Sequence, residues 1–193
     1  MQIYLKPYPH NTYCNVPYAE EKTRHNGTRN YGYKDVKKFK GLIKKIPEVK
    51  DAPKLGDLIQ KINQRIFTTY GCDVGVSPVG TYYQSWTFVN FHFDDMDLNH
   101  TEENYFNLVA KFLEYFATEV SENLIMEFVI NPTNFHDPER IKKGAKPKEE
   151  TVMFRGYSIN CKIIGVGESI DLAKSVMNLG LDHATEFLSR YNI

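Results

Sequence analysis

The chain has 193 residues, of which 41 % are apolar and 13 % aromatic, enough to form the core of one domain. Its 24 Lys and Arg balance its 24 Asp and Glu, which excludes a histone-like cation and an acidic, disordered chain. The longest apolar stretch, residues 124–130, contains Glu127 and falls far short of the roughly 20 residues of a membrane span. The sequence therefore predicts a soluble protein of one domain that does not cross a membrane.

The compartment is predicted from the first residues and from the cysteines. The segment MQIYLKPYPH has no basic stretch followed by an apolar one, so we expect no secretory signal. Cys14, Cys72 and Cys161 are odd in number and widely spaced, which is typical of free thiols in a reducing compartment. A cytoplasmic protein is the expectation.

The charges are unevenly distributed along the chain. Residues 1–60 carry twelve Lys or Arg and six Asp or Glu, a net charge of +6, whereas residues 61–193 carry twelve and eighteen, a net charge of −6. Two such poles can steer a charged partner, or they can pair with each other inside the fold. Both interpretations remain open from the sequence.

Residues 1–33 are predicted to form an irregular, tyrosine-rich arm. Residues 3–5 have the character of a short strand, but prolines at positions 7, 9 and 17 interrupt the segment. Six of the thirteen tyrosines lie here, among them Tyr31 and Tyr33. A tyrosine buries its ring yet tolerates water at its hydroxyl, so the arm suits either a wrapped segment or an interface.

Two amphipathic helices are predicted next, over residues 35–46 and 54–70. Lysines fill most positions between the apolar residues of the first, and Pro47 is expected to end it. Gly71 is a good terminator for the second. The apolar positions are Val36, Phe39, Leu42, Ile43 and Ile46 in the first helix, and Leu55, Leu58, Ile59, Ile62 and Ile66 in the second.

The centre of the chain is predicted to hold strands and one long helix. Residues 74–79 and 82–93 are typical of two strands joined by a turn at Gly80. Apolar residues recur at steps of three and four over residues 102–121, which predicts a helix of several turns. Residues 124–130 have the composition of a buried strand.

The last third of the chain is predicted to contain a loop, two strands and a helix. Residues 131–150 are polar with three prolines, which predicts a long surface loop. Residues 151–157 and 159–165 are typical of two strands, and residues 169–191 of an amphipathic helix with Gly180 on its apolar face. There is no regular alternation of strand and helix. We therefore expect an α+β domain over residues 34–193, with a mixed or mainly antiparallel sheet of about five strands and amphipathic helices packed on it.

A dense group of polar residues, HFDDMDLNH, begins at His92 where a strand is expected to end and a helix to begin. Asp95, Asp97 and Asn99 match the first three ligands of a calcium loop, but His100 stands where that loop needs glycine and Phe106 where it needs glutamate. Three interpretations stay open: helix capping, an acidic protein-binding surface, and a magnesium site. Thr101 joins Asp97 and Asn99 as a capping candidate, and the candidate metal ligands are His92, Asp95 and Asp97.

Other motifs carry weaker signals. His10-Asn-Thr12 has the form used by two-histidine phosphoesterases, but the second copy that such an enzyme needs is missing: His92-Phe-Asp94 has an acid in place of the hydroxyl. Gly165-Val-Gly167 joins a strand to a helix, yet Ile170 replaces the third glycine of a dinucleotide fingerprint, and a turn capped by Ser169 accounts for the same residues. The cysteines form no zinc-type spacing. The lysine-rich first helix, with Tyr31, Tyr33 and Phe39 nearby, could stack on a single strand, but a net charge of zero argues against nucleic acid.

The layout of the elements resembles one family of proteins. An amphipathic helix (LGDLIQKINQRIFTTYG) leads to an aromatic strand (SWTFVNFHF), and a strand (SINCKIIGV) leads to a C-terminal helix (LAKSVMNLGLDHATEFLSRY). Over about residues 54–191 the chain is thus similar to the small cytoplasmic immunity proteins that bacteria keep against their own contact-dependent or polymorphic toxins. The resemblance implies a non-catalytic inhibitor, without a cofactor, that binds and neutralises a cognate toxin. The same description fits a phage-encoded inhibitor of a defence protein.

Two hypotheses of different classes follow. As an inhibitor, the protein would bind its partner, possibly a basic toxin nuclease domain, through Asp94, Asp95, Asp97, Glu102 and Glu103 together with Tyr31 and Tyr33. As an enzyme, it would be a metal-dependent phosphodiesterase that uses His92, Asp94 and Asp95. A third option is a structural subunit whose arm makes contacts between copies. The oligomeric state is open from the sequence.

Overall fold

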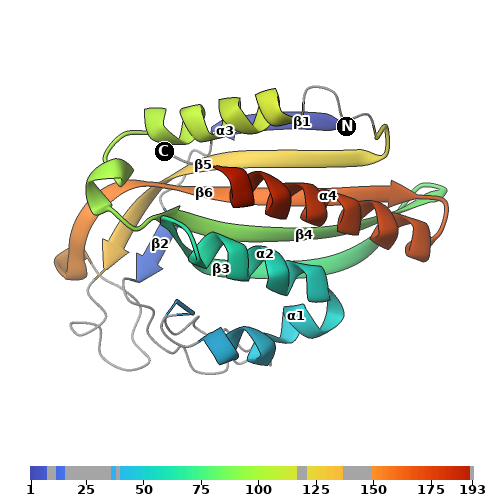
Figure 1. The fold of residues 1–193 in the computed structure, drawn as a ribbon, viewed down its shortest axis with the longest axis horizontal. Helices are drawn as coiled ribbons and strands as arrows, with labels where there is room; N and C mark the ends of the chain where they lie inside the picture. The colour runs from blue at the N-terminus through green and yellow to red at the C-terminus, as the bar shows by residue number, and fades with distance from the viewer. Residues whose placement is uncertain (8–11, 16–35, 38–39, 117–120, 137–148, 192–193) are drawn as a thin grey trace.

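The computed structural model describes residues 1–7, 12–15, 36–37, 40–116, 121–136 and 149–191. Within them the chain forms one α+β domain, built on a mixed sheet with helices packed against it. The sheet is five positions wide, in the order β1-β5-β6-β4-β3, and β2 pairs with β5 beyond the end of β1. Figure 1 shows the helices α2, α3 and α4 in front of this sheet. The expected fold class is confirmed.

The sheet combines long antiparallel strands with a parallel edge. The antiparallel strands are β3 (Phe67–Val79), β4 (Tyr82–Phe93), β6 (Val152–Gly167) and β5 (Leu124–His136), and they pair in the order β3-β4-β6-β5. The short strands β1 (Gln2–Pro7) and β2 (Thr12–Asn15) both run parallel to β5. Residues 1–33 therefore contribute two strands rather than a wholly irregular arm.

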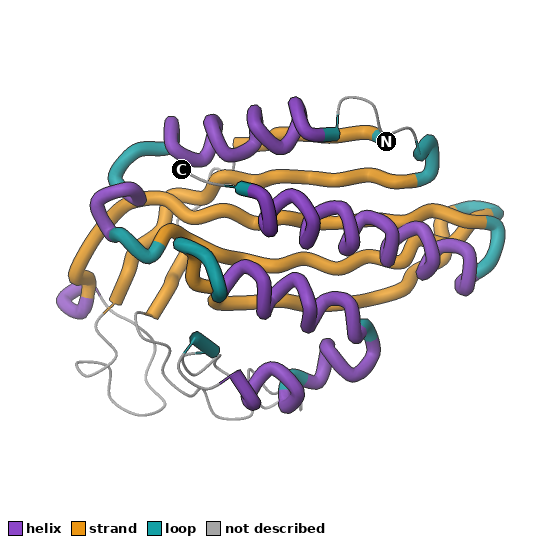
Figure 2. The backbone as a smooth tube through the Cα atoms, viewed as in Figure 1, coloured by secondary structure: helices purple, strands orange, loops and turns teal. Residues whose placement is uncertain are grey.

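The helices lie together on one face of the sheet (Figure 2). They are α1 (Pro47–Asp51), α2 (Pro53–Asn63), α3 (Glu103–Tyr115) and α4 (Ile170–Arg190). Every second residue of β4 points at them, and Val89, Phe91 and Phe93 are almost fully buried there. Their ring and aliphatic contacts with the apolar stripes of the helices form a single continuous core.

Two glycines let α4 approach the sheet closely. Gly180 is buried on the apolar face of α4, where an added Cβ would lie 2.5 Å from Ile163 Cγ2 and 2.7 Å from Leu124 Cδ1. Gly165 of β6 lies against the backbone of α4, and an added Cβ would overlap Ala173 O and Met177 N. The expectation that Gly180 lies on the packed face is confirmed.

Three boundaries predicted in the first half of the chain are wrong. The lysine-rich segment gives a 3₁₀ helix, Lys40–Lys45, rather than an α-helix over 35–46, and part of that range lies outside the described residues. Pro47 begins α1 instead of only ending a helix, because proline lacks the N–H that the first turn does not need. The helix predicted over 54–70 ends at Asn63, and β3 starts at Phe67, since Thr68, Thr69 and Tyr70 favour strand.

The loop predicted over residues 131–150 is also wrong, and so is the break predicted between strands at 151–157 and 159–165. β5 continues through residue 136, where its polar side chains are buried and hydrogen-bonded: Thr133 Oγ1 donates to Asn131 O at 2.9 Å. Residues 137–148 lie outside the described residues. Residues 151–167 contain one strand, β6, because Ser158 is fully buried and bonded to Thr133 Oγ1 at 2.6 Å rather than exposed in a turn. The helix predicted over 102–121 is described as Glu103–Tyr115.

Candidate functional site

The acidic residues singled out in the sequence lie in the connection between β4 and α3. We call Asp94, Asp95, Asp97, Glu102 and Glu103 the acidic corner. β4 ends at Phe93, a short 3₁₀ helix follows over Met96–Asn99, and α3 begins at Glu103. The corner is therefore a tight turn held between a central strand and a helix of the core.

Asn99 fixes the shape of this corner from inside. It is 0 % exposed, its Oδ1 accepts from Phe93 N at 3.0 Å, and its Nδ2 donates to Phe93 O at 2.9 Å and to Asp95 O at 3.1 Å. The Tyr105 hydroxyl lies 2.5 Å from the same Oδ1 and 2.9 Å from Tyr157 O, and it donates to these acceptors. Asn99 thus ties the turn to β4, α3 and β6, and its oxygen is unavailable to a cation.

Asp94 is committed to the fold. Its carboxylate pairs with Lys37 and accepts from Thr68 Oγ1 at 2.6 Å, and its backbone N–H donates to Ile66 O at 2.7 Å. Lys37 belongs to the basic N-terminal part of the sequence, so the two charge poles meet here. A second pair, Lys54 with Asp182, joins the same two halves of the chain.

The other carboxylates of the acidic corner either cap a helix or face solvent. Asp95 Oδ1 accepts from Asp97 N at 3.0 Å and caps the 3₁₀ helix, while Thr101 Oγ1 accepts from Glu103 N at 3.2 Å at the start of α3. The side chain of Asp97 is 92 % exposed, with only His100 Nε2 3.9 Å away. Glu102 and Glu103 are also exposed. Of the three capping candidates, Thr101 makes such a contact, whereas Asp97 and Asn99 do not cap a helix, and Asp95, which was not among the candidates, caps the 3₁₀ helix instead. The carboxylates of Asp97, Glu102 and Glu103 face solvent.

The proposed metal site is not formed. His92 is 2 % exposed on the face of the sheet turned away from the helices, where its ring makes an edge contact with Phe135 at 5.1 Å. Its Nδ1 donates to Phe93 O at 2.6 Å. Within the described ranges, no group of three or more His, Cys, Asp or Glu could hold a metal ion, so His92, Asp95 and Asp97 are not brought together. Asp94, another acid of the phosphodiesterase hypothesis, pairs with Lys37 and Thr68.

Burial of His92 predicts an acid-sensitive fold. Desolvation lowers the pKa of His92 from its usual 6.5, so the unfolded chain binds a proton more readily than the folded one. The contribution of neutral His92 to the free energy of unfolding is therefore fully present above about pH 6.5. It is lost progressively as the pH falls below that value. We expect thermal melts between pH 7.5 and 5 to show this loss and His92→Gln to reduce it. The exposed His100→Gln is the control and should leave the slope unchanged; an unchanged slope in His92→Gln would contradict the prediction.

Nothing in the sequence indicated a row of hydrogen-bonded hydroxyl groups that lies beside His92. The hydroxyls of Tyr70 and Ser158 lie 2.6 Å apart, and Ser158 Oγ lies 2.6 Å from Thr133 Oγ1. Ser158 and Thr133 are buried. These residues come from three different strands, and only their register places them side by side, so no spacing in the sequence could have grouped them.

A groove lies along α3 next to the acidic corner. It has a volume of about 340 Å³ and runs between α3, the end of β4 and the end of α4. Phe93, Leu98 and Tyr191 give it an apolar floor, and the Lys111 ammonium lies 5.3 Å from the centre of the Tyr191 ring. Asn104, Asn107, Ala110 and Glu114 complete its lining. Leu98 belongs to the 3₁₀ helix of the corner, so one residue of that turn lines the groove.

The remaining motifs have structural roles or lie outside the described residues. His10, Tyr31 and Tyr33 are among the residues not described; of the arm, the structure describes residues 1–7 and 12–15. Gly165 and Gly167 are closed off by α4, and Ser169 caps that helix by accepting from Leu172 N at 3.2 Å. The turn therefore has the capping role weighed from the sequence.

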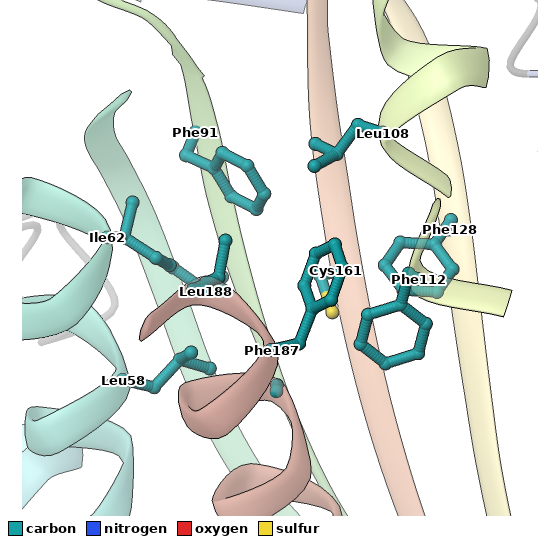
Figure 3. A pocket seen from close by; sticks show the side chains of 11 residues that line it. Leu58, Ile62, Phe91, Leu108, Phe112, Phe128, Cys161, Phe187 and Leu188 are labelled. Atoms are coloured by element: carbon teal, nitrogen blue, oxygen red, sulfur yellow. The ribbon is translucent and has the colours of Figure 1, made fainter. Parts of the chain in front are cut away.

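Cys161 lies deep in the core and is not a nucleophile. Burial raises the pKa of its thiol to about 12, so it stays protonated at neutral pH. It borders an internal apolar cavity of about 20 Å³, where Figure 3 shows it among Phe112, Phe187 and Leu188. Its role is that of a small hydrophobic residue, as its strand position predicted.

Comparison with known proteins gives no relative. No family model, curated protein or solved structure matches this chain. Of the helices in the described residues, none has the length and apolar character to span a membrane.

Proposed function

We propose that this protein is a non-catalytic, protein-binding inhibitor that holds a basic partner against its acidic corner, as a cytoplasmic immunity protein holds a toxin. The observation that carries the proposal is a set of three exposed carboxylates on a turn fixed from inside. In the described part of the chain, Asp97, Glu102 and Glu103 form no ion pair with a lysine or arginine, so their charges are available to a partner. Because Asn99 holds the turn, little conformational entropy is lost on binding.

The adjoining groove supports the same use. Interfaces combine an apolar, often aromatic centre with a polar rim. Here Leu98 and Tyr191 offer the centre, while the exposed residues Asp97 and Glu103 directly precede the lining residues Leu98 and Asn104 in the chain. A partner with an arginine- or lysine-rich loop would place apolar side chains in the groove and its cations at the corner.

Neutralising the exposed acids is expected to slow capture of the partner. In the variant Asp97→Asn with Glu102→Gln and Glu103→Gln, the shape is kept but three charges are lost. Electrostatic steering mainly raises the association rate, so we expect this rate to fall by about tenfold at low salt and its salt dependence to flatten. The measurement is surface plasmon resonance with the partner purified after affinity capture from host lysate, at several ionic strengths.

A matched variant tests whether position matters as well as charge. Asp57→Asn with Glu122→Gln and Glu168→Gln removes the same charge from three exposed sites elsewhere. It should keep nearly the full association rate. Equal effects of the two triple variants would refute the acidic corner as the docking surface. The inhibitor function itself has a separate readout: the wild-type chain should suppress the toxicity of the captured partner when both are expressed in the same cell, and a partner that stays toxic would overturn it.

A further inference from the structure

A second cleft opens on the helix side of the sheet, between α4 and the junction of α1 with α2. It has a volume of about 290 Å³ and shares no lining residue with the groove along α3 or with the acidic corner. In the view of Figure 1, β3 and β4 cross the space between α4 and α1. We call it the α1–α4 cleft. Its volume is at the small end of the roughly 300–1,000 Å³ of small-molecule sites, so its ligand would be small.

The floor of the α1–α4 cleft is apolar apart from one hydroxyl. Val74 and Val76 of β3 contribute to it, together with the buried Met177 of α4. Ser85 of β4 also lines the cleft; it is 1 % exposed, and its hydroxyl donates to Met177 Sδ at 3.3 Å. A thioether is a weak acceptor. The floor therefore offers apolar surface and a hydroxyl that is only weakly hydrogen-bonded.

One wall of the cleft is acidic. Asp51 lines it at the end of α1, and two further carboxylates, those of Glu48 and Asp73, lie nearby. Burial raises the pKa of Glu48, and the charges of Asp73 and Asp51 raise it further, so the three carboxylates interact. Among the described residues, none of the three forms an ion pair with a lysine or arginine. This wall therefore attracts a cation.

The other wall, formed by α4, carries a cation and an amide. Lys174 and Asn178 line it one helical turn apart. In the ranges that the structure describes, Lys174 forms no ion pair, so it does not pair with Asp51 although both line the same cleft. The ion pair between Lys54 and Asp182 joins α2 to α4 beside the cleft and holds the two walls together.

We propose that the α1–α4 cleft binds a free amino acid with an apolar side chain, its ammonium at Asp51 and its carboxylate at Lys174 and Asn178. A purely anionic ligand would meet the repulsion of the acidic wall, and a purely cationic one would leave Lys174 without a counter-charge. A small molecule that carries both charges satisfies both walls at once. Its apolar side chain would pack on Val76 and Met177 at the floor.

Titration of the ¹⁵N-labelled protein with L-leucine tests the proposal by NMR. The amide signals of residues 51–52, 74–76 and 174–178 should shift and saturate at millimolar concentrations. Two analogues keep the apolar group but lose one charge: 3-methylbutylamine lacks the carboxylate, and 4-methylpentanoate lacks the ammonium. Each should bind at least tenfold more weakly than leucine. Unchanged spectra with leucine, or equal binding of either analogue, would overturn the proposal.

Substitutions of the two charged residues test their roles. Asp51→Asn and Lys174→Gln should each raise the dissociation constant for leucine at least tenfold, and both positions are exposed, so the fold should be kept. Asp57→Asn and Lys45→Gln are the matched controls, because they remove the same charges from exposed positions that do not line the cleft. Equal losses in the two pairs would contradict the proposed contacts. The titration needs no protein partner, so its outcome is independent of the acidic corner.

Discussion

Gly165→Val is expected to destabilise the protein by more than about 3 kcal/mol, the largest effect of any single substitution considered, because overpacking against backbone cannot be relieved by side-chain rotation. Gly165 lies in β6 directly beneath α4, and an added Cβ would overlap Ala173 O and Met177 N. The variant must push α4 off the sheet or fail to fold. Urea unfolding followed by circular dichroism measures the loss.

The control for this prediction is a glycine in open space. Gly41 has no atom within 4 Å of the position of an added Cβ, so Gly41→Ala should change stability by no more than about 1 kcal/mol. A Gly165→Val protein with near-normal stability would show that α4 can retreat from β6 at little cost, contrary to the packing described.

Asn99→Ala is expected to cost about 3 kcal/mol and to loosen the acidic corner. The substitution leaves the N–H and C=O of Phe93 and the hydroxyl of Tyr105 without their partner in a buried site, and each buried polar group left unsatisfied costs about 1–3 kcal/mol. Because the same side chain shapes the 94–103 turn, hydrogen exchange in that segment should accelerate beyond the change expected from global stability alone.

Asn107→Ala separates the loss of this network from the loss of an amide. Asn107 is exposed on α3, so its removal should stay within about 0.5 kcal/mol and leave exchange at 94–103 unchanged. If Asn99→Ala lowered stability but left exchange in the turn at its global rate, Asn99 would be a core residue without a role in shaping the corner.

Elements whose apolar residues recur at regular spacing were predicted from the sequence. Elements that depend on pairing with residues far along the chain were not. The stripe that ends near Tyr191 predicted α4 almost to its last residue, because a helix satisfies its own backbone. The strand character of Ile3–Leu5 was visible but its place in the sheet was not, since its partner is β5, more than a hundred residues away. For the same reason residues 131–136 looked like a loop: their polar side chains are satisfied by neighbours that the sequence does not identify.

The candidate site shows the same limit. That Asp97, Glu102 and Glu103 are exposed follows from their position between a strand and a helix. That Asp94 pairs with Lys37 does not, because the contact joins residues 57 positions apart. Asn99 stood in the spacing of a cation ligand, and only the structure shows its side chain turned inward. A polar pattern predicts that a group is hydrogen-bonded but not with which partner.

The parallel pairing of β1 with β5 has a consequence for how the chain folds. Gln2 pairs with Ile125, so during synthesis β1 leaves the ribosome long before its partner exists. Closing so long a loop is entropically costly, and contacts of such separation form late. The β3–β4 hairpin forms from residues close together in the chain, so it can be complete while β1 is still unpaired. β1 is therefore expected to dock last, and the nascent chain exposes its apolar side chains until β5 is made.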